Sequence, residues 1–185
     1  MMPPQRSSSH IRTHLPPKIL VSACLIGKRC SFKGNHHLDP AIRSLFDSGR
    51  AIAACPEELG GLGTPRQTSE IVGGDGSRVL AGKARVITRS QRDVTRQFVK
   101  GARMTLAIAR DNKVRLAIFK TKSPSCGCGR IYDGTFSSRS KPGCGVTATL
   151  LLDRGIFVLN ELDWERARRV SHRTFTDKHL KSYGK

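Results

Sequence analysis

The stretch Val114-Arg-Leu-Ala-Ile-Phe-Lys-Thr-Lys-Ser-Pro-Ser-Cys-Gly-Cys-Gly129 decides the predicted fold, because a strand leads directly into a cysteine loop in it. Its first six residues are mostly apolar and include β-branched residues, as is typical of a buried strand. Proline, serine and glycine then end the strand abruptly. We therefore expect Cys126 in a tight loop at the carboxyl end of this strand.

Two earlier apolar runs each lead to a cysteine in the same way. Residues 18–23 lead into Cys24, and residues 50–54 lead into Cys55. In an open parallel sheet the carboxyl ends of the strands lie along one edge, where the binding crevice forms. Three thiols at that edge predict a metal site or a redox site.

The segments between these runs contain helix signals. Asp39 is placed to cap a helix that begins at Pro40 and ends before Gly49, and residues 51–54 then complete a parallel β-α-β unit. The apolar face of this helix is predicted to hold Ile42, Leu45 and Phe46.

Later segments extend the same pattern. A second helix is predicted from Asp93 to about Arg110, a third over 146–153, and a last strand over 156–159. The stripe of the second helix comprises Val94, Phe98, Ala102, Leu106 and Ala109. Together these elements predict a single-domain, three-layer α/β fold with a mostly parallel, Rossmann-like sheet and cysteines at the carboxyl ends of its strands.

Three segments give weaker structural signals. Residues 58–66 are too rich in Gly and Pro for a helix or a strand, and a loop of this length in a compact domain is usually functional. Residues 71–88 are interpreted as a small hairpin around the turn 73–76, and residues 132–136 as a turn.

Length and charge bound the function class. The 185 residues suit one domain, and 33 basic against 14 acidic residues give a net charge of +19. Most of this excess lies within residues 18–161, so phosphate-bearing ligands or nucleic acid are candidate partners. The alternative is that the charge serves solubility or gives weak RNA affinity.

The terminal segments and the cysteine content indicate the domain layout and the cellular compartment. Residues 1–17 are interpreted as a disordered extension, 18–161 as the folded domain, and 162–185 as a basic tail with a possible short helix from Trp164. The sequence shows no secretory signal and no apolar run long enough to cross a membrane. Six cysteines without a secretion signal predict a reducing, cytoplasmic environment.

The cysteines have a functional and a structural interpretation. Cys24, Cys55 and Cys126 could each be a small buried hydrophobe, but their shared placement at strand ends favours a joint site. There is no Cys-x-x-Cys pair, which argues against zinc ribbons and thioredoxin-like chemistry. Three separate thiolates suit an iron–sulfur cluster with one iron left free for substrate.

The other three cysteines are Cys30, Cys128 and Cys144, and we interpret them as spectators. Cys128 is also a candidate fourth ligand, since it follows Cys126 by two residues. Cys144 lies near a predicted helix start, where a thiolate is stabilised.

Polar residues beside the cysteines are candidates for proton transfer and substrate binding. Glu57 follows Cys55 by two residues and is a plausible proton carrier, whereas Glu58 should point elsewhere. Ser123 and Ser125 are either turn formers or substrate-binding hydroxyls. Arg66, with the backbone amides of the preceding Gly-rich loop, could hold a carboxylate or phosphate.

The chain resembles the thiouracil desulfurases, a bacterial group long catalogued as a domain of unknown function. The resemblance covers about residues 18–161. It rests on Val21-Ser-Ala-Cys24-Leu-Ile-Gly27, Cys55-Pro-Glu57-x-x-Gly-Gly61-Leu, Pro65-Arg66, Asp93-Val-Thr95, Lys122-Ser-Pro-Ser125-Cys126-Gly127, Ile131-Tyr-Asp-Gly134 and Gly145-Val-Thr-Ala148.

This resemblance implies a [4Fe-4S] cluster held by Cys24, Cys55 and Cys126, whose fourth iron binds the sulfur of a thiolated pyrimidine. It further implies that Glu57 is the catalytic carboxylate and Ser125 the assisting hydroxyl. The chain departs from the family pattern at Cys128 and Cys144, where non-thiol residues are expected. Relatives that act on thiolated tRNA carry a further domain, which is absent from this sequence.

The predicted function is therefore a desulfidase that acts on thiouracil, thiouridine or its monophosphate and releases hydrosulfide. The substrate, the position of its sulfur and the oligomeric state stay open. The alternative function is a basic RNA-binding module whose cysteines hold a structural metal.

Overall fold

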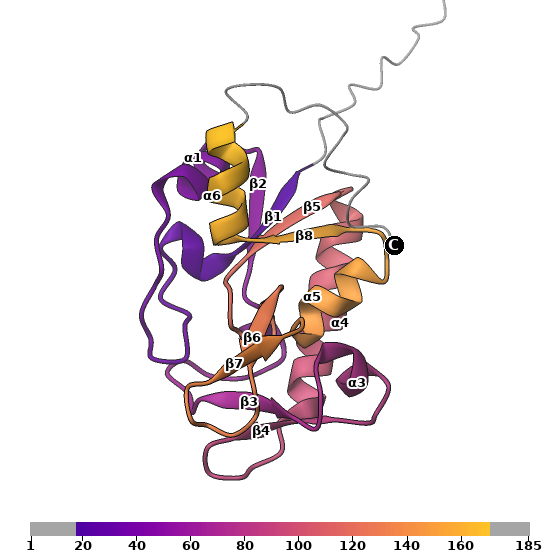
Figure 1. Ribbon diagram of the computed structural model, residues 1–185. Helices are drawn as coiled ribbons and strands as arrows, with labels where there is room; N and C mark the ends of the chain where they lie inside the picture. The colour runs from indigo at the N-terminus through magenta and orange to yellow at the C-terminus, as the bar shows by residue number, and fades with distance from the viewer. Residues whose placement is uncertain (1–17, 171–185) are drawn as a thin grey trace, which may run out of the picture.

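The computed structural model describes residues 18–170. Its central sheet has four parallel strands in the order β2-β1-β5-β8 (Figure 1). They span Ile19–Ser22 (β1), Ala51–Ala54 (β2), Leu116–Phe119 (β5) and Phe157–Asn160 (β8). The three strands predicted to precede the cysteines are thus neighbours in one parallel sheet.

Helices cover both faces of this sheet, as the predicted three-layer α/β fold requires. α4 (Thr95–Asp111) and α5 (Val146–Leu152) lie on one side, and α1 (Pro40–Asp47) and α6 (Glu161–Val170) on the other (Figure 1). The alternation of side chains along a strand explains the two layers. Leu20 packs in the core on the α4 and α5 side, and its neighbour Val21 packs in the core on the α1 side.

The predicted helix signals are confirmed with one exception. The carboxylate of Asp39 accepts hydrogen bonds from the backbone N–H groups of Ala41 and Ile42, and the predicted stripe of α4 is buried throughout. The apolar face of α1 was predicted to bury Phe46, but this side chain is exposed. Ile42 alone is fully covered, because the short α1 contacts the sheet along a narrow line.

The predicted hairpin over residues 71–88 is only partly correct. β3 (Ser69–Val72) and β4 (Arg85–Thr88) do pair antiparallel. However, residues 79–80, predicted as extended, belong to the helix α3 (Gly76–Leu80). Asp75 caps this helix by accepting hydrogen bonds from the N–H groups of Ser77 and Arg78, so helix capping overrides the β propensity of Val79.

Four further short elements were not predicted. The 3-10 helix η1 (Ala23–Ile26) continues directly from β1, and the one-turn helix α2 (Pro56–Leu59) occupies the start of the segment expected to be irregular. β6 (Arg130–Tyr132) and β7 (Ser140–Pro142) pair antiparallel around the predicted turn. Each has four residues or fewer, which is too short to give a periodic signal.

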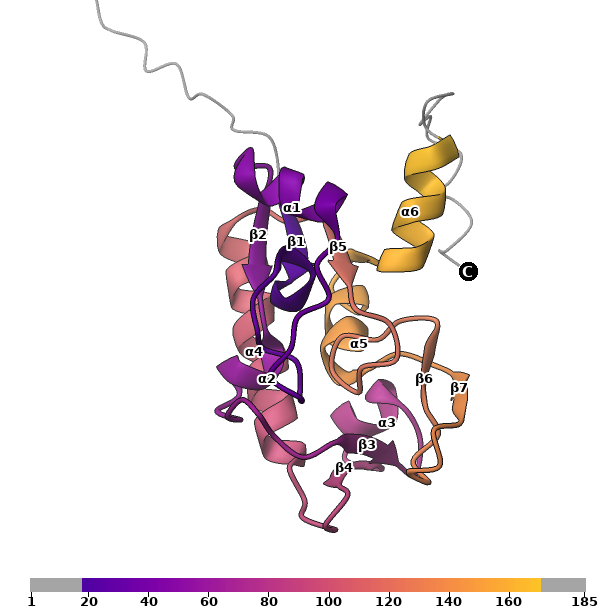
Figure 2. The same cartoon turned by 90° about the vertical axis from the view of Figure 1, so that its left-hand side faces the viewer.

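The small sheets lie opposite the carboxyl ends of the central strands. Figure 2 shows β3, β4, β6 and β7 below β1, β2 and β5, with α3 beside them. A cavity between the two layers is lined from both sides, by Ser22 and Ala54 at the ends of central strands and by Ser69 and Tyr132 in the small sheets. The fold therefore builds its binding crevice at the predicted edge.

The ends of the predicted domain layout are only partly described. Residues 1–17, predicted as disordered, and residues 171–185 of the predicted basic tail lie outside the described residues. α6 begins at Glu161, and Trp164 packs against the core on the α1 side. Within residues 18–170, no helix is long and apolar enough to cross a membrane.

Candidate active site

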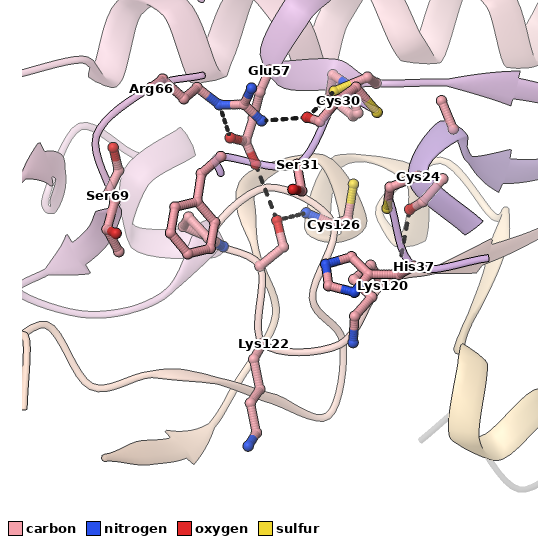
Figure 3. Close-up of a pocket in the computed structure, with 18 of the residues that line it drawn as sticks. Cys24, Cys30, Ser31, His37, Glu57, Arg66, Ser69, Lys120, Lys122 and Cys126 are labelled. Carbon is pink, nitrogen blue, oxygen red and sulfur yellow. Dashed lines mark hydrogen bonds and ion pairs between the residues drawn. The ribbon is translucent and has the colours of Figure 1, made fainter. Parts of the chain in front are cut away.

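A cavity of about 260 Å³ lies at the carboxyl ends of β1, β2 and β5, and Figure 3 shows the side chains around it. Cys24, Cys55 and Cys126 all line it. Cys24 lies in η1, Cys55 immediately precedes α2, and Cys126 lies in the loop after β5. The three thiols predicted to converge therefore reach one cavity from three separate strands.

A fourth thiol, that of Cys30, lies beside them. Cys30 lines the same cavity and is 2% exposed. Hydrogen bonding to the Cys24 thiol raises the pKa of Cys30 to about 12. Cys30, interpreted from the sequence as a spectator, therefore lies among the thiols of the cavity, and its role as a ligand stays a prediction to be tested. The missed signal is Gly27, whose backbone adopts φ of 94° and turns the chain back toward η1.

Crowding and burial oppose ionisation of Cys30, Cys55 and Cys126. The hydrogen bond with Cys30 and burial raise the pKa of Cys55, and burial raises the pKa of Cys126. A set of neighbouring buried thiols loses its protons together only when a positive charge such as a metal centre is supplied. The donor set is therefore that of a site for a thiophilic metal group.

The carboxylate of Glu57, in the first turn of α2, lines the cavity. Its Oε2 lies 2.6 Å from Arg66 Nε, and its Oε1 accepts a hydrogen bond from Ser123 Oγ at 3.3 Å. The side chains of Glu57 and Arg66 are 15% and 10% exposed, so the ion pair is largely shielded from water. The carboxylate is thus held in one position at the cavity wall (Figure 3).

Arg66 is fully engaged by protein groups. Besides Glu57, it donates hydrogen bonds to Thr64 Oγ1 at 3.0 Å, to the Gly63 carbonyl at 3.3 Å and to the Cys30 carbonyl at 3.0 Å. Burial opposes its charge, but the Glu57 carboxylate raises the pKa of Arg66. The geometry therefore suits Arg66 to positioning Glu57 and the Cys30 segment rather than to holding a substrate phosphate.

The two candidate serines occupy different environments. Ser123 lines the cavity, and its Oγ also accepts hydrogen bonds from the N–H groups of Ser125 and Cys126. Ser125 is fully buried, and its hydroxyl lies 2.8 Å from Thr147 Oγ1. Of the two serines, Ser123 is therefore the one that hydrogen-bonds to Glu57, and the hydroxyl of Ser125 is used within the core.

Glu58 points away from Glu57, as expected from the sequence. Its carboxylate pairs with Lys28 Nζ at 2.6 Å and accepts a hydrogen bond from Thr64 at 3.2 Å. One carboxylate oxygen of Glu58 also lies within 4.8 Å of the thiols of Cys30 and Cys55. These three groups form a possible second ligand set for a single metal ion.

Basic residues line part of the cavity. His37, Lys120 and Lys122 line it, and burial lowers the pKa of His37, which favours the neutral imidazole (Figure 3). Lys120 pairs with Glu161 at 2.5 Å, whereas Lys122 makes no ion pair within residues 18–170. A neighbouring hollow shares Phe32, Arg66, Gln67 and Thr68 with the cavity and adds Lys33 and Arg89.

The remaining cysteines lie outside this cavity. Cys128 and Cys144 are half-buried and free, and their sulfur atoms are 2.7 Å apart. They do not line the pocket that holds the other four thiols.

The fold and the cavity define an α/β protein with a thiol-lined metal centre at the carboxyl edge of a parallel sheet. The family model for 2-thiouracil desulfurase matches residues 19–163, and the chain belongs to this family.

The chain is also similar to two individual proteins, one in sequence and one in sequence and structure. The uncharacterized protein YbbK of Bacillus subtilis (strain 168) is 48% identical over 143 residues, which are 77% of this chain and 95% of YbbK. The solved structure of the [4Fe-4S]-dependent thiouracil desulfidase TudS has a TM-score of 0.72 and 39% identity, covering 84% of this chain and 98% of that one.

Proposed function

We propose that this protein is a desulfidase that removes sulfur from a thiolated pyrimidine with the help of a [4Fe-4S] cluster. The observation that carries the proposal is the convergence of Cys24, Cys55 and Cys126 with the Glu57–Ser123 pair on one cavity. Membership of the 2-thiouracil desulfurase family and the [4Fe-4S]-dependent activity of the TudS neighbour support it.

The residues present fit such a cluster. Cys24, Cys55 and Cys126 would hold it, because their thiols line the same cavity and three thiolates leave one iron open. When bound, the cluster supplies a soft Lewis acid for the thiocarbonyl sulfur. Cys30, beside Cys24 and Cys55, could hold iron as a fourth thiolate, so the ligand set is tested directly below.

The protein's own groups supply proton transfer. Glu57, fixed by Arg66, accepts a proton from the water that adds to the thiolated carbon, and returns it as the sulfur departs. Ser123, hydrogen-bonded to Glu57, orients the substrate or the water. We assign this role to Ser123 rather than Ser125, because the Ser125 hydroxyl is used by Thr147.

The mouth of the cavity favours an anionic substrate. Lys122, together with Lys33 and Arg89 of the adjoining hollow, suits the phosphate of a thiolated nucleoside monophosphate. The free thiols of the site suit a reducing compartment, so we place the protein in the cytoplasm.

Iron and sulfide analysis of six single Cys→Ala variants, purified anaerobically, tests the proposal. The cluster should be lost in Cys24→Ala, Cys55→Ala and Cys126→Ala and retained in Cys30→Ala, Cys128→Ala and Cys144→Ala. The wild-type protein should release hydrosulfide from at least one member of a panel of thiolated bases, nucleosides and nucleotides. Full cluster content in Cys126→Ala, or no hydrosulfide from any member, would refute the assignment.

A further inference from the structure

The sheet formed by β6 and β7 sets the position of Cys128 and Cys144. Arg130 pairs with Pro142 in this antiparallel ladder, and the register continues past the ends of both strands. The Gly143 N–H donates to the Gly129 carbonyl at 3.3 Å, and the Gly145 N–H donates to the Gly127 carbonyl at 2.7 Å. Cys128 therefore lies directly opposite Cys144.

The hydrogen bonds also define the type of this pair. They flank Cys128 and Cys144 on both sides, so the two cysteines form a non-hydrogen-bonded pair, in which facing side chains are closest. The Cα separation of such a pair, about 4.5 Å, lies within the range that a disulfide spans. Their sulfur atoms, 2.7 Å apart, need to close by only a fraction of an ångström to reach the bond length of about 2.05 Å.

The surrounding backbone holds this geometry. The carbonyl of Cys128 accepts a hydrogen bond from Asn160 Nδ2 at 3.2 Å. On the other segment, an added Cβ at Gly145 would lie 2.5 Å from the Ser125 carbonyl oxygen, so only glycine allows this close approach. The loop that carries Cys126 and the segment before α5 are thus packed backbone to backbone.

We propose that Cys128 and Cys144 form a reversible thiol–disulfide couple that covalently fastens the Cys126 loop to the segment before α5. The co-reactant is a low-molecular-weight disulfide such as oxidised glutathione. This inference does not depend on whether the neighbouring thiols hold a cluster, because both sulfur atoms lie outside that cavity.

The chemistry is ordinary thiol–disulfide exchange. The Cys144 thiolate attacks one sulfur of the small disulfide and releases one small thiolate. Cys128 then loses its proton and displaces the second small thiolate from the mixed disulfide, forming the Cys128–Cys144 bond. Two protein thiols are oxidised by two electrons, and one small disulfide is reduced to two thiols that take up the two protons. The hydrogen bond from Cys128 supports this order, since it lowers the pKa of Cys144 to about 7.

Peptide mapping of the full chain, equilibrated anaerobically in glutathione buffers of increasing oxidation, tests the proposal. After acid quenching and alkylation, trypsin separates the two cysteines because Arg130 and Arg139 lie between them. We expect one disulfide-linked peptide pair that contains Cys144, with fragmentation assigning the partner as Cys128 rather than Cys126. Alkylation of both Cys128 and Cys144 in the most oxidising buffer, or a bridge from Cys144 to Cys126, would overturn the proposal.

Thermal unfolding provides the second measurement. The bond would close the loop between residues 128 and 144, so oxidation should raise Tm by roughly 5–10 °C. This difference between oxidised and reduced protein should disappear in Cys144→Ser and in Cys128→Ser. An equal shift in the folded serine variants would show that another oxidation causes it and would contradict the proposal.

Discussion

The fold holds the carboxylate of Glu57, the proposed proton-transfer group, in a fixed position. Cys55 directly precedes α2, and Pro56 at the first helical position fixes the backbone between Cys55 and Glu57. Arg66 and Ser123 then each hold one oxygen of the carboxylate. The position of the Glu57 carboxylate is therefore set by three neighbours, namely Pro56, Arg66 and Ser123.

Replacing Glu57 with glutamine should preserve the site but remove its proton acceptor. We expect Glu57→Gln to keep its iron and sulfide content and to lose about 10²–10⁴-fold in kcat, which is typical for a positioned acid–base group. The matched control is Glu58→Gln, one residue further along the same helix, whose carboxylate pairs with Lys28. Near-normal kcat in a cluster-loaded Glu57→Gln enzyme would transfer the role to another group.

The two serines allow a second comparison between residues. Ser123→Ala should lower kcat, whereas Ser125→Ala should lower stability by about 1–3 kcal/mol because it leaves the buried Thr147 hydroxyl without its partner. Turnover per cluster and urea unfolding distinguish the two effects. Unchanged turnover per cluster in Ser123→Ala, with a large loss in Ser125→Ala, would restore the role that the family resemblance implied for Ser125.

At the scale of elements, the packing of α2 on α4 positions Cys55. Gly101 of α4 lies against the start of α2, where an added Cβ would overlap the Pro56 carbonyl oxygen. The buried glycine therefore lets the helix backbones approach closely. The same contact fixes the residue between a proposed cluster ligand and the proposed base.

Gly101→Ala should consequently disturb both stability and the metal centre. We expect a loss of about 1–3 kcal/mol from overpacking, together with lower iron content, because α2 has to shift. Gly63→Ala is the matched control, since a Cβ there meets no atom within 4 Å. Chemical unfolding and iron analysis of both variants measure the effects. Equal iron content in the two variants would show that α2 does not determine the position of Cys55.

The sequence predicted the elements whose signals are local. The capped helix after Asp39, the stripe of α4 and the strands before Cys24, Cys55 and Cys126 were predicted, since caps and periodicity are written in neighbouring residues. α3 and the β6–β7 pair were not predicted, because their few residues gain stability from tertiary contacts. The membership of Cys30 in the site depends on a left-handed turn at Gly27, and the directions of Ser123 and Ser125 depend on a tight turn. The spacing of residues along the sequence predicts neither the position of Cys30 nor the directions of the Ser123 and Ser125 side chains.

On the scale of the whole molecule, we expect the net charge of +19 to favour phosphorylated substrates. A thiolated nucleoside monophosphate should have a higher kcat/KM than its nucleoside at low salt, and high salt should reduce this preference by screening. Arg89→Gln, in the hollow beside the cavity, should weaken the preference, whereas Arg103→Gln on the exposed side of α4 should not. Salt-independent ratios in wild type would remove the electrostatic explanation.

The proposed cluster also links distant parts of the chain. Its ligands come from η1, the start of α2 and the loop after β5, so bound iron should stabilise the native state as a whole. Removing iron with a chelator should lower Tm by several degrees, whereas the same treatment of Cys126→Ala should change little. Differential scanning calorimetry of both proteins makes the comparison, and an equal Tm with and without iron would exclude a stabilising link.

The order of these ligands along the chain has a consequence for protein synthesis. A ribosome releases Cys24, Cys30 and Cys55 long before Cys126, so the nascent chain already carries two of the proposed ligands and the neighbouring thiol of Cys30. Cys30, Cys55 and Glu58, whose ligand atoms lie within 4.8 Å of one another when folded, all belong to this early segment. Zinc, which binds such thiolates readily, can therefore compete for the first part of the site before the last ligand is translated. The complete set of proposed ligands is available to iron and sulfide only after Cys126 has been synthesised.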